Sequence, residues 1–161
     1  MGIIETNNIS ILLNHLESNI PFFKSSNMDI SKADVGWHIE HTLLSINKVT
    51  DLLNNSRPED YKWKFNMLRV IFLTFKKIPR GKAKAPKAVR PEREITKNSL
   101  LMHLSKTRNK IKELNNVSSD RFFEHPYFGK LSLRQTMVSI EIHTKHHLKI
   151  IDDILMQVNK K

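Results

Sequence analysis

Residues 132–158 read SLRQTMVSIEIHTKHHLKIIDDILMQV, and this stretch decides the fold class of the chain. Apolar side chains recur in it at intervals of three and four residues, which is the spacing of one face of an α-helix. Ser132 and Gln135 match a capping box, the hydrogen-bonding pattern that opens many helices. The pattern therefore predicts one long amphipathic helix from Ser132 to about Val158. Its buried stripe consists of Leu133, Thr136, Ile140, Ile150, Ile154 and Val158.

Two histidines share the face of this stripe. His143 and His147 are one helical turn apart, about 40° from each other around the axis, so both rings are expected to point into the core. A buried imidazole pair can bind one metal ion, or it can be satisfied by hydrogen bonds alone, and the spacing leaves both interpretations open. Thr144 stands where the HExxH motif has its Glu, which disfavours a zinc-protease mechanism. His146 is expected at the edge of the stripe.

The rest of the chain has the same helical periodicity and no convincing strand alternation. We predict four further helices, at about Thr6–Asn19, Ser31–Asn55, Pro58–Lys77 and Thr96–Leu114. Long amphipathic helices without strands predict an all-α fold, a helical bundle in one domain that covers residues 1–161.

The composition agrees with a single folded domain. The chain has 161 residues and a mass of 18.9 kDa, 39% of its residues are hydrophobic, and its formal net charge is +11. The absence of Cys excludes disulfide scaffolds, thiolate metal sites and cysteine nucleophiles, and it favours a cytoplasmic location. The longest apolar runs have about four residues, far fewer than the roughly 20 of a membrane span, so no membrane partner is expected.

Much of the positive charge lies in the segment Lys76–Arg93, KKIPRGKAKAPKAVRPER, which has eight basic residues and one Glu. Its prolines and its glycine exclude a continuous helix, so we predict a long basic crossover loop. In this loop Lys82, Lys84 and Lys87 are candidates for binding an anionic substrate or a thiol cofactor, and the alternative is a solvated loop. The loop has no aromatic residue to stack on bases, so nucleic acid is not the expected partner.

A third metal ligand has to come from another helix. His41 in the predicted helix Ser31–Asn55 is the first candidate, and His38, three residues earlier, is the competing choice. For a catalytic acid or base the sequence offers four candidates and no geometry that selects one. They are His38, Glu40, His125 and His146.

The segment His125–Gly129, HPYFG, precedes the last helix. Pro126 favours an extended conformation at His125, and Gly129 permits a turn. One interpretation places His125 or Tyr127 beside the site, as a polar contact to substrate. The other makes the segment an aromatic plug over the end of the bundle.

Three features in this order resemble the DinB-like superfamily, in particular its bacterial branch of domains of unknown function. They are Ser31–Leu43 with His-Thr-Leu at positions 41–43, the HPYFG segment, and His143-x-x-x-His147 with His146. The resemblance covers about residues 5–158. It implies a DinB-like four-helix bundle, here with an extra helix and the basic crossover loop. Members of the family often form dimers, so a homodimer is among the expected partners.

The resemblance also implies a function. Family members typically bind a divalent metal through three histidines, which correspond here to His41, His143 and His147. Zinc or nickel is the first expectation, and iron or manganese also accepts imidazole ligands. The relatives are described as metal-dependent hydrolases or small-thiol-dependent transferases, so we expect one of these activities on a small molecule. The alternative is a basic bundle that binds nucleic acid or an acidic partner and whose histidines are structural.

Overall fold

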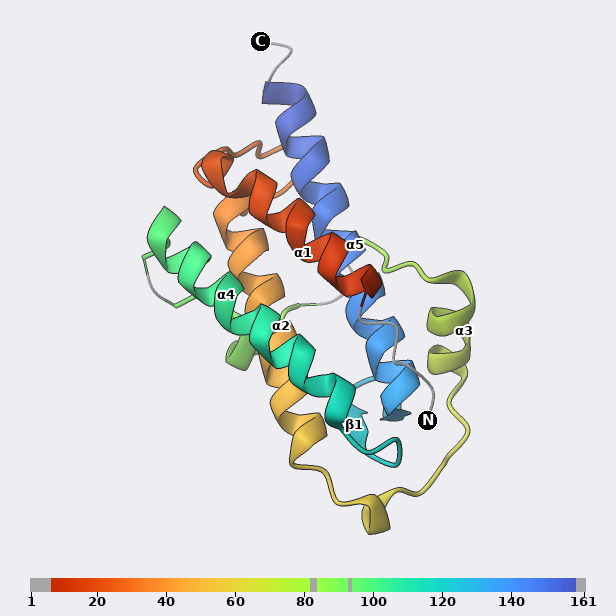
Figure 1. Ribbon diagram of the computed structural model, residues 1–161. Helices are drawn as coiled ribbons and strands as arrows, with labels where there is room; N and C mark the ends of the chain where they lie inside the picture. Colours follow the sequence, from red (N-terminus) through yellow and green to blue (C-terminus); the bar gives the residue numbers. More distant parts are fainter. Residues whose placement is uncertain (1–6, 82–83, 93, 159–161) are drawn as a thin grey trace.

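The computed structural model describes residues 7–81, 84–92 and 94–158 (Figure 1). The described chain is mainly helical, as predicted. Its helices are α1 (Asn7–Asn19), α2 (Val35–Asn54), α3 (Met67–Phe75), α4 (Lys97–Glu113) and α5 (Leu133–Val158). Two strands, β1 (Phe122–His125) and β2 (Gly129–Ser132), form an antiparallel hairpin. Short 3-10 turns lie at Ile20–Phe22, Pro58–Asp60, Lys87–Val89 and Leu114–Asn116.

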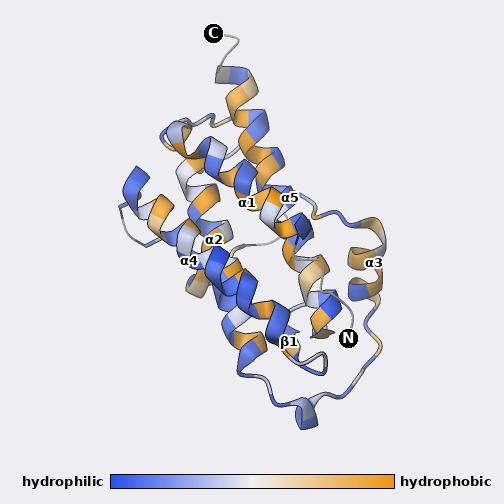
Figure 2. Cartoon of the chain, in the orientation of Figure 1, coloured by the Kyte–Doolittle hydropathy of each residue, from blue (hydrophilic) through white to orange (hydrophobic). Residues whose placement is uncertain are grey.

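The four long helices share one apolar core. Helix α2 packs against both α4 and α5, and α1 packs against the same two helices. In Figure 2 these helices carry apolar and polar residues in alternating patches, as expected for helices with one buried face. Each fully buried aliphatic side chain contributes about 1.5–3 kcal/mol. Among those that are at most 2% exposed are Leu13, Leu16, Ile39, Leu43, Leu104 and Ile154. Within the described residues, no helix has both the length and the apolar character needed to cross a membrane.

Side-chain caps define where the helices begin. The Asp34 side chain accepts a hydrogen bond from the backbone N–H of Trp37 at 2.7 Å, so α2 begins at Val35 and not at Ser31 as predicted. The predicted capping box at the start of α5 is confirmed. The Ser132 N–H donates to the Gln135 side chain at 3.1 Å, and the Gln135 N–H donates to the Ser132 hydroxyl at 3.3 Å.

Gly36 lets the first turn of α2 approach the chain that precedes it. Its N–H donates to the carbonyl oxygen of Phe23 at 2.7 Å. A Cβ at position 36 would lie 2.9 Å from that same oxygen and 3.3 Å from a methyl carbon of Ile95. The glycine is therefore required by a close backbone contact.

Gly36→Ala is expected to destabilise the protein by about 1–3 kcal/mol, because a backbone oxygen has to move to make room for the methyl group. At an unobstructed helix position the same substitution stabilises a protein by about 0.5–1 kcal/mol. The change in the free energy of unfolding therefore has opposite signs with and without the close contact, so measuring it decides between the two cases. Urea unfolding followed by circular dichroism gives the free energy of unfolding, and a stabilised variant would contradict the close contact.

The β1–β2 hairpin corrects the prediction of a fold without strands. Phe122 pairs with Ser132 at one end of the hairpin and His125 with Gly129 at the other. Gly129 has φ +66°, a backbone conformation that favours glycine. Strands of four residues are too short to show a recognisable alternation, so hydrophobic periodicity does not detect them. The hairpin places the HPYFG segment at the N-terminal end of α5.

The predicted helix Pro58–Lys77 is shorter in the structure. Only Met67–Phe75 is α-helical, while residues 61–66 form no regular structure. The Asn66 side chain accepts a hydrogen bond from the Arg69 N–H at 2.9 Å and so caps α3. An Asn side chain competes with the backbone for hydrogen bonds, so it starts a helix more readily than it continues one. The crossover loop that follows agrees with the prediction, since the only helix or strand element in its described part is the 3-10 turn at Lys87–Val89.

Candidate metal centre

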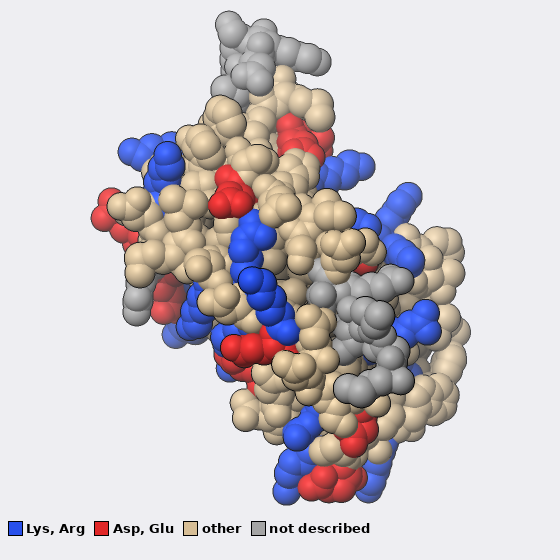
Figure 3. Space-filling model, in the orientation of Figure 1, with Lys and Arg blue, Asp and Glu red and all other residues tan. Residues whose placement is uncertain are grey.

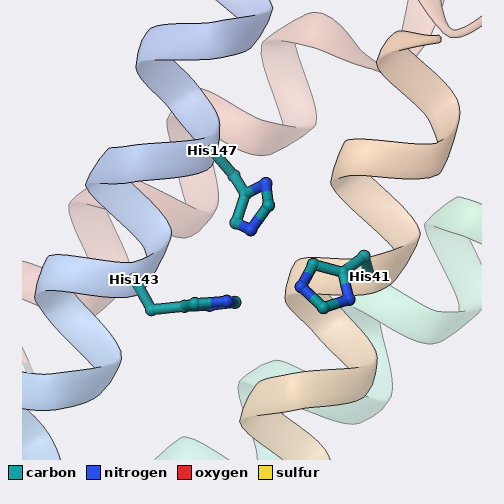
Figure 4. Close-up of side chains that lie close together, drawn as sticks. All are labelled: His41, His143 and His147. Atoms are coloured by element: carbon teal, nitrogen blue, oxygen red, sulfur yellow. The ribbon is translucent and has the colours of Figure 1, made fainter. Parts of the chain in front are cut away.

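Three histidines converge between α2 and α5. His41 projects from α2, and His143 and His147 project from α5 toward it (Figure 4). One candidate ligand atom from each ring lies within 4.8 Å of the other two. His41 and His147 are only 4% and 7% exposed, and His143 is half-buried. The prediction that these three residues lie together is confirmed, and the cluster can hold a metal ion.

The periodicity of α5 explains this placement. The stripe residues Leu133, Thr136, Ile140, Ile150 and Ile154 are all buried, while the Val158 side chain lies outside the described part of the chain. His143 and His147 belong to the same face, and the packing of α2 on α5 brings His41 opposite them. Ring centroids are 4.6 Å apart for His143 and His147, and 5.2 and 4.7 Å from these two to His41.

The His41 ring is held from two sides. It stacks on Trp37 with 4.9 Å between ring centroids, and its Nδ1 lies 2.7 Å from the carbonyl oxygen of Val89. A carbonyl only accepts, so the proton of the neutral ring is on Nδ1 and the lone pair is on Nε2. Metal-binding histidines commonly donate their second nitrogen in this way, which orients the ring and fixes its tautomer.

His147 has a comparable partner in His38. Their Nδ1 atoms are 2.9 Å apart, and Nε2 of His38 is 2.9 Å from the Ser31 hydroxyl. If Nδ1–H of His147 donates to His38, then Nε2–H of His38 donates to Ser31, and His147 keeps its lone pair on Nε2. His38, the competing choice for the third ligand, thus lies behind His147. His41 is the α2 residue in the three-histidine cluster.

Burial keeps these histidines neutral. Burial lowers the pKa of His143 to about 3 and the pKa of His38 to about 4, and neighbouring imidazoles add to both shifts. The pKa values of His41 and His147 are also lowered, in both cases chiefly by burial. Metal ions bind the neutral form of imidazole. At neutral pH the cluster therefore has its lone pairs available without losing protons.

Two of the predicted acid–base candidates lie in different surroundings. Glu40 faces α4, where each of its carboxylate oxygens is 2.9 Å from Nδ1 of His103, so its side chain is engaged outside the three-histidine cluster. His146 lies next to the cluster, with 5.1 Å between its ring centroid and that of His147. Burial lowers the pKa of His146, and a backbone hydrogen bond with Ile78 partly opposes this effect.

His125 is fixed by the hairpin. Its Nδ1 accepts hydrogen bonds from the backbone N–H groups of Tyr127 at 3.1 Å and Phe128 at 3.3 Å, and its ring stacks on Phe128. Burial lowers the pKa of His125 to about 4, so the ring is neutral at pH 7. Because Nδ1 accepts two hydrogen bonds, the proton of the neutral ring is on Nε2. A positive charge on His125 would add to the lowering of the His143 pKa, after burial, His41 and His146. Tyr127 is 55% exposed.

The basic crossover loop runs along the histidine cluster. It contacts His41 through Val89 and His146 through Ile78. Arg80 ties the loop to α5 by an ion pair with Asp153 at 2.6 Å. Of the lysines predicted to bind an anion, Lys84 and Lys87 are exposed, and Lys82 lies outside the described residues.

One polar network and two hydrogen-bond partners, Val89 of His41 and Ser31 of His38, were not predicted from the sequence. Nε2 of His103 lies 2.6 Å from the side-chain amide nitrogen of Asn47, which extends the Glu40–His103 pair between α2 and α4. His103 follows Leu100 by three residues and precedes Thr107 by four, so helical spacing alone could have identified it. No comparable signal exists for Val89, which contacts His41, or for Ser31, which contacts His38, because neither residue lies in a helix with an apolar stripe.

The geometry limits what this site can do. Three neutral imidazoles from two packed helices could supply three protein ligands, the number found in catalytic metal sites, whereas structural zinc sites have four. Water or substrate can take the remaining positions.

Comparisons of this chain with protein-family models, with curated proteins and with solved structures find no match.

Proposed function

We propose that this chain is a DinB-like four-helix-bundle metalloenzyme, a hydrolase or a small-thiol-dependent transferase that acts on a small molecule. One observation carries the proposal: ligand atoms of His41, His143 and His147 lie within 4.8 Å of one another. The zinc or nickel expected from the resemblance fits this donor set, and iron or manganese is also compatible with it.

The surrounding residues fit a bound divalent ion. Val89 holds the proton of His41 on Nδ1, and His38 is placed to accept the proton of His147. Both ligands then present Nε2, and a half-buried His143 completes the set. Such outer partners usually change metal affinity by 10- to 100-fold. When bound, a divalent ion supplies a Lewis acid that lowers the pKa of water or of a small thiol.

The protein contributes positioning and proton placement. His125 keeps its proton on Nε2, because both hydrogen bonds at Nδ1 come from backbone donors. It is therefore suited to donate a hydrogen bond to substrate and not to accept a proton. His146 is the better candidate for a base among the four predicted, since it is adjacent to the cluster and Glu40 is engaged with His103.

The proposal is tested on tag-free protein that has been stripped with a chelator. Reconstitution with zinc, nickel, iron(II) or manganese(II) should give about one ion per chain, since one three-histidine cluster is present among the described residues. At least one loaded form should hydrolyse members of an ester and amide panel, or transfer a small thiol to electrophiles. Failure to bind metal would refute the site, and stoichiometric metal without turnover on either panel would refute the enzyme.

The exposed lysines of the crossover loop test the class of substrate. We expect the double variant Lys84→Gln/Lys87→Gln to raise KM for an anionic substrate about three- to tenfold and to leave kcat unchanged, because long-range attraction acts on encounter. Lys106→Gln, an exposed lysine on α4, is the matched control and should have no effect. Unchanged KM in the double variant at low salt would contradict a role of the loop in binding anions.

A further inference from the structure

Helix α3 exposes apolar side chains where an ordinary surface helix exposes polar ones. Arg69 is only 4% exposed, whereas Leu68, Ile71 and Phe75 are 57%, 46% and 67% exposed. These three apolar residues and Met67 occupy one face, since they follow the spacing of a helix. In Figures 1 and 2, α3 stands apart from the long helices and is mostly apolar. The face that a soluble protein usually makes polar is here apolar.

The chain before α3 extends this apolar surface. Trp63 and Phe65 are both 64% exposed, although large aromatic side chains gain most from burial. We call the whole set the α3 face. It consists of Trp63, Phe65, Met67, Leu68, Val70, Ile71 and Phe75, each at least 45% exposed.

The α3 face is held firmly despite its exposure. Arg69 donates to the carbonyl oxygens of Lys130 and Lys64. Phe72 is buried and stacks on Phe128 with 4.3 Å between ring centroids. The side chain of Asn66 donates to the Tyr127 carbonyl at 3.1 Å. These contacts fix α3 on the β1–β2 hairpin with its apolar side outward, so the exposure is a property of the fold.

Positive charge surrounds the α3 face. No Asp or Glu occurs from Tyr61 to Pro91, and ten Lys or Arg residues lie in this segment. Next to the apolar side chains, Lys62, Lys64, Lys76 and Lys77 are all exposed. Figure 3 shows Lys and Arg atoms beside the uncharged atoms at the edge where α3 lies. The segment from Tyr61 to Pro91 therefore combines apolar, aromatic and cationic residues and has no acidic residue of its own.

We propose that the α3 face docks the protein on the surface of an anionic lipid bilayer. The apolar and aromatic side chains would enter the boundary between headgroups and acyl chains, where Trp is favoured, and the lysines would contact anionic headgroups. This is peripheral binding and requires no spanning segment. It revises the expectation from sequence that membranes are not partners of this chain.

Charge and side-chain type favour a lipid surface over two other partners, a second copy of the chain and single-stranded nucleic acid. A second copy of the chain docked through the same face would bring two acid-free basic segments together, and like charges would repel. Single-stranded nucleic acid would use the aromatic rings for stacking but would gain little from Leu68, Val70 and Ile71. An anionic bilayer interacts favourably with both the aliphatic groups and the lysines.

Flotation of the purified full-length chain with vesicles tests the proposal. Binding is expected to vesicles of phosphatidylcholine and phosphatidylglycerol in equal parts and to be much weaker with phosphatidylcholine alone. Leu68→Asn/Ile71→Asn should weaken binding at least about tenfold through loss of apolar contact. Lys76→Gln/Lys77→Gln should weaken it about fivefold for each lysine. Phe65→Ser, at a 64% exposed position outside the described helices, should weaken binding as well.

Matched controls come from other exposed positions. Ile11 on α1 is 58% exposed, and Ile11→Asn should leave binding unchanged, as should Lys106→Gln/Lys112→Gln on α4. Absence of binding to anionic vesicles would overturn the proposal. It would also be overturned if the apolar variants bound like wild type, if they instead split a dimer in sedimentation, or if the lysines were needed only for single-stranded RNA.

Discussion

His143→Ala is expected to lower the affinity of the protein for zinc or nickel by more than about a hundredfold. The variant leaves two imidazoles where the wild type has three, and it removes half of the i, i+4 pair on α5. Removing an outer-shell partner alone costs 10- to 100-fold, so removing a ligand should cost more. Competition with a chromophoric chelator, followed by elemental analysis, measures the change.

The same measurement decides between His41 and His38 as the α2 ligand. His41→Ala should behave like His143→Ala, since His41 belongs to the cluster. His38→Ala should lower the metal affinity only 10- to 100-fold, because His38 acts through its hydrogen bond to His147. His103→Ala is the control, a histidine on α4 paired with Glu40. A larger loss in His38→Ala than in His41→Ala would reverse the assignment.

Acidification is expected to destabilise the metal-free protein by at least about 3 kcal/mol between pH 6.5 and pH 4. Burial lowers the pKa of His38 and of His125 to about 4, and lowers the pKa of His143 to about 3. In the unfolded chain the histidines have pKa values near 6.5, so as the pH falls the unfolded chain binds protons before the folded protein does. The contribution of these neutral histidines to the free energy of unfolding is therefore fully present above pH 6.5. It is lost as the pH falls toward the folded-state pKa values, by about 1.4 kcal/mol per pH unit for each histidine.

Urea unfolding in the presence of a chelator at pH 7, 6 and 5 measures this dependence. His125→Asn should reduce the slope of unfolding free energy against pH by about one proton, since it removes one half-buried neutral imidazole outside the three-histidine cluster. Total stabilities of 5–15 kcal/mol are usual, so the expected loss is a large fraction of the whole. A free energy of unfolding that does not change from pH 7 to pH 5 would contradict neutral burial of these rings.

Much of the helical architecture could be predicted from local sequence. The stripe and the Ser132–Gln135 capping box of α5 define its start and its buried face, and both agree with the structure. The predictions of α1 and α4 end close to the observed bounds for the same reason. The prediction was wrong at the hairpin, because strands of four residues are too short to be recognised from periodicity. It was also wrong about the start of α3, because Asn66 caps the helix there although the apolar pattern begins earlier.

The candidate metal site divides in the same way. The i, i+4 spacing already placed His143 and His147 on one face, because side-chain direction along a helix is a local property. The choice between His41 and His38 depended on how α2 rotates against α5, which is set by packing between distant segments. The outward apolar side of α3 was equally hidden, since Arg69 and the aliphatic residues are neighbours in sequence and only their contacts separate them.

The sequence by itself determined the mainly helical class, the face of α5 that is buried, the irregular basic loop and the pair of histidines one turn apart. Only the tertiary structure decided that His41 completes the cluster, that Val89 and His38 orient its rings, and that α3 turns its apolar side to solvent. The physical reason is range: periodicity and capping act within a few residues, whereas hydrogen bonds such as His41 to Val89 join segments 48 residues apart and form only once the helices have packed.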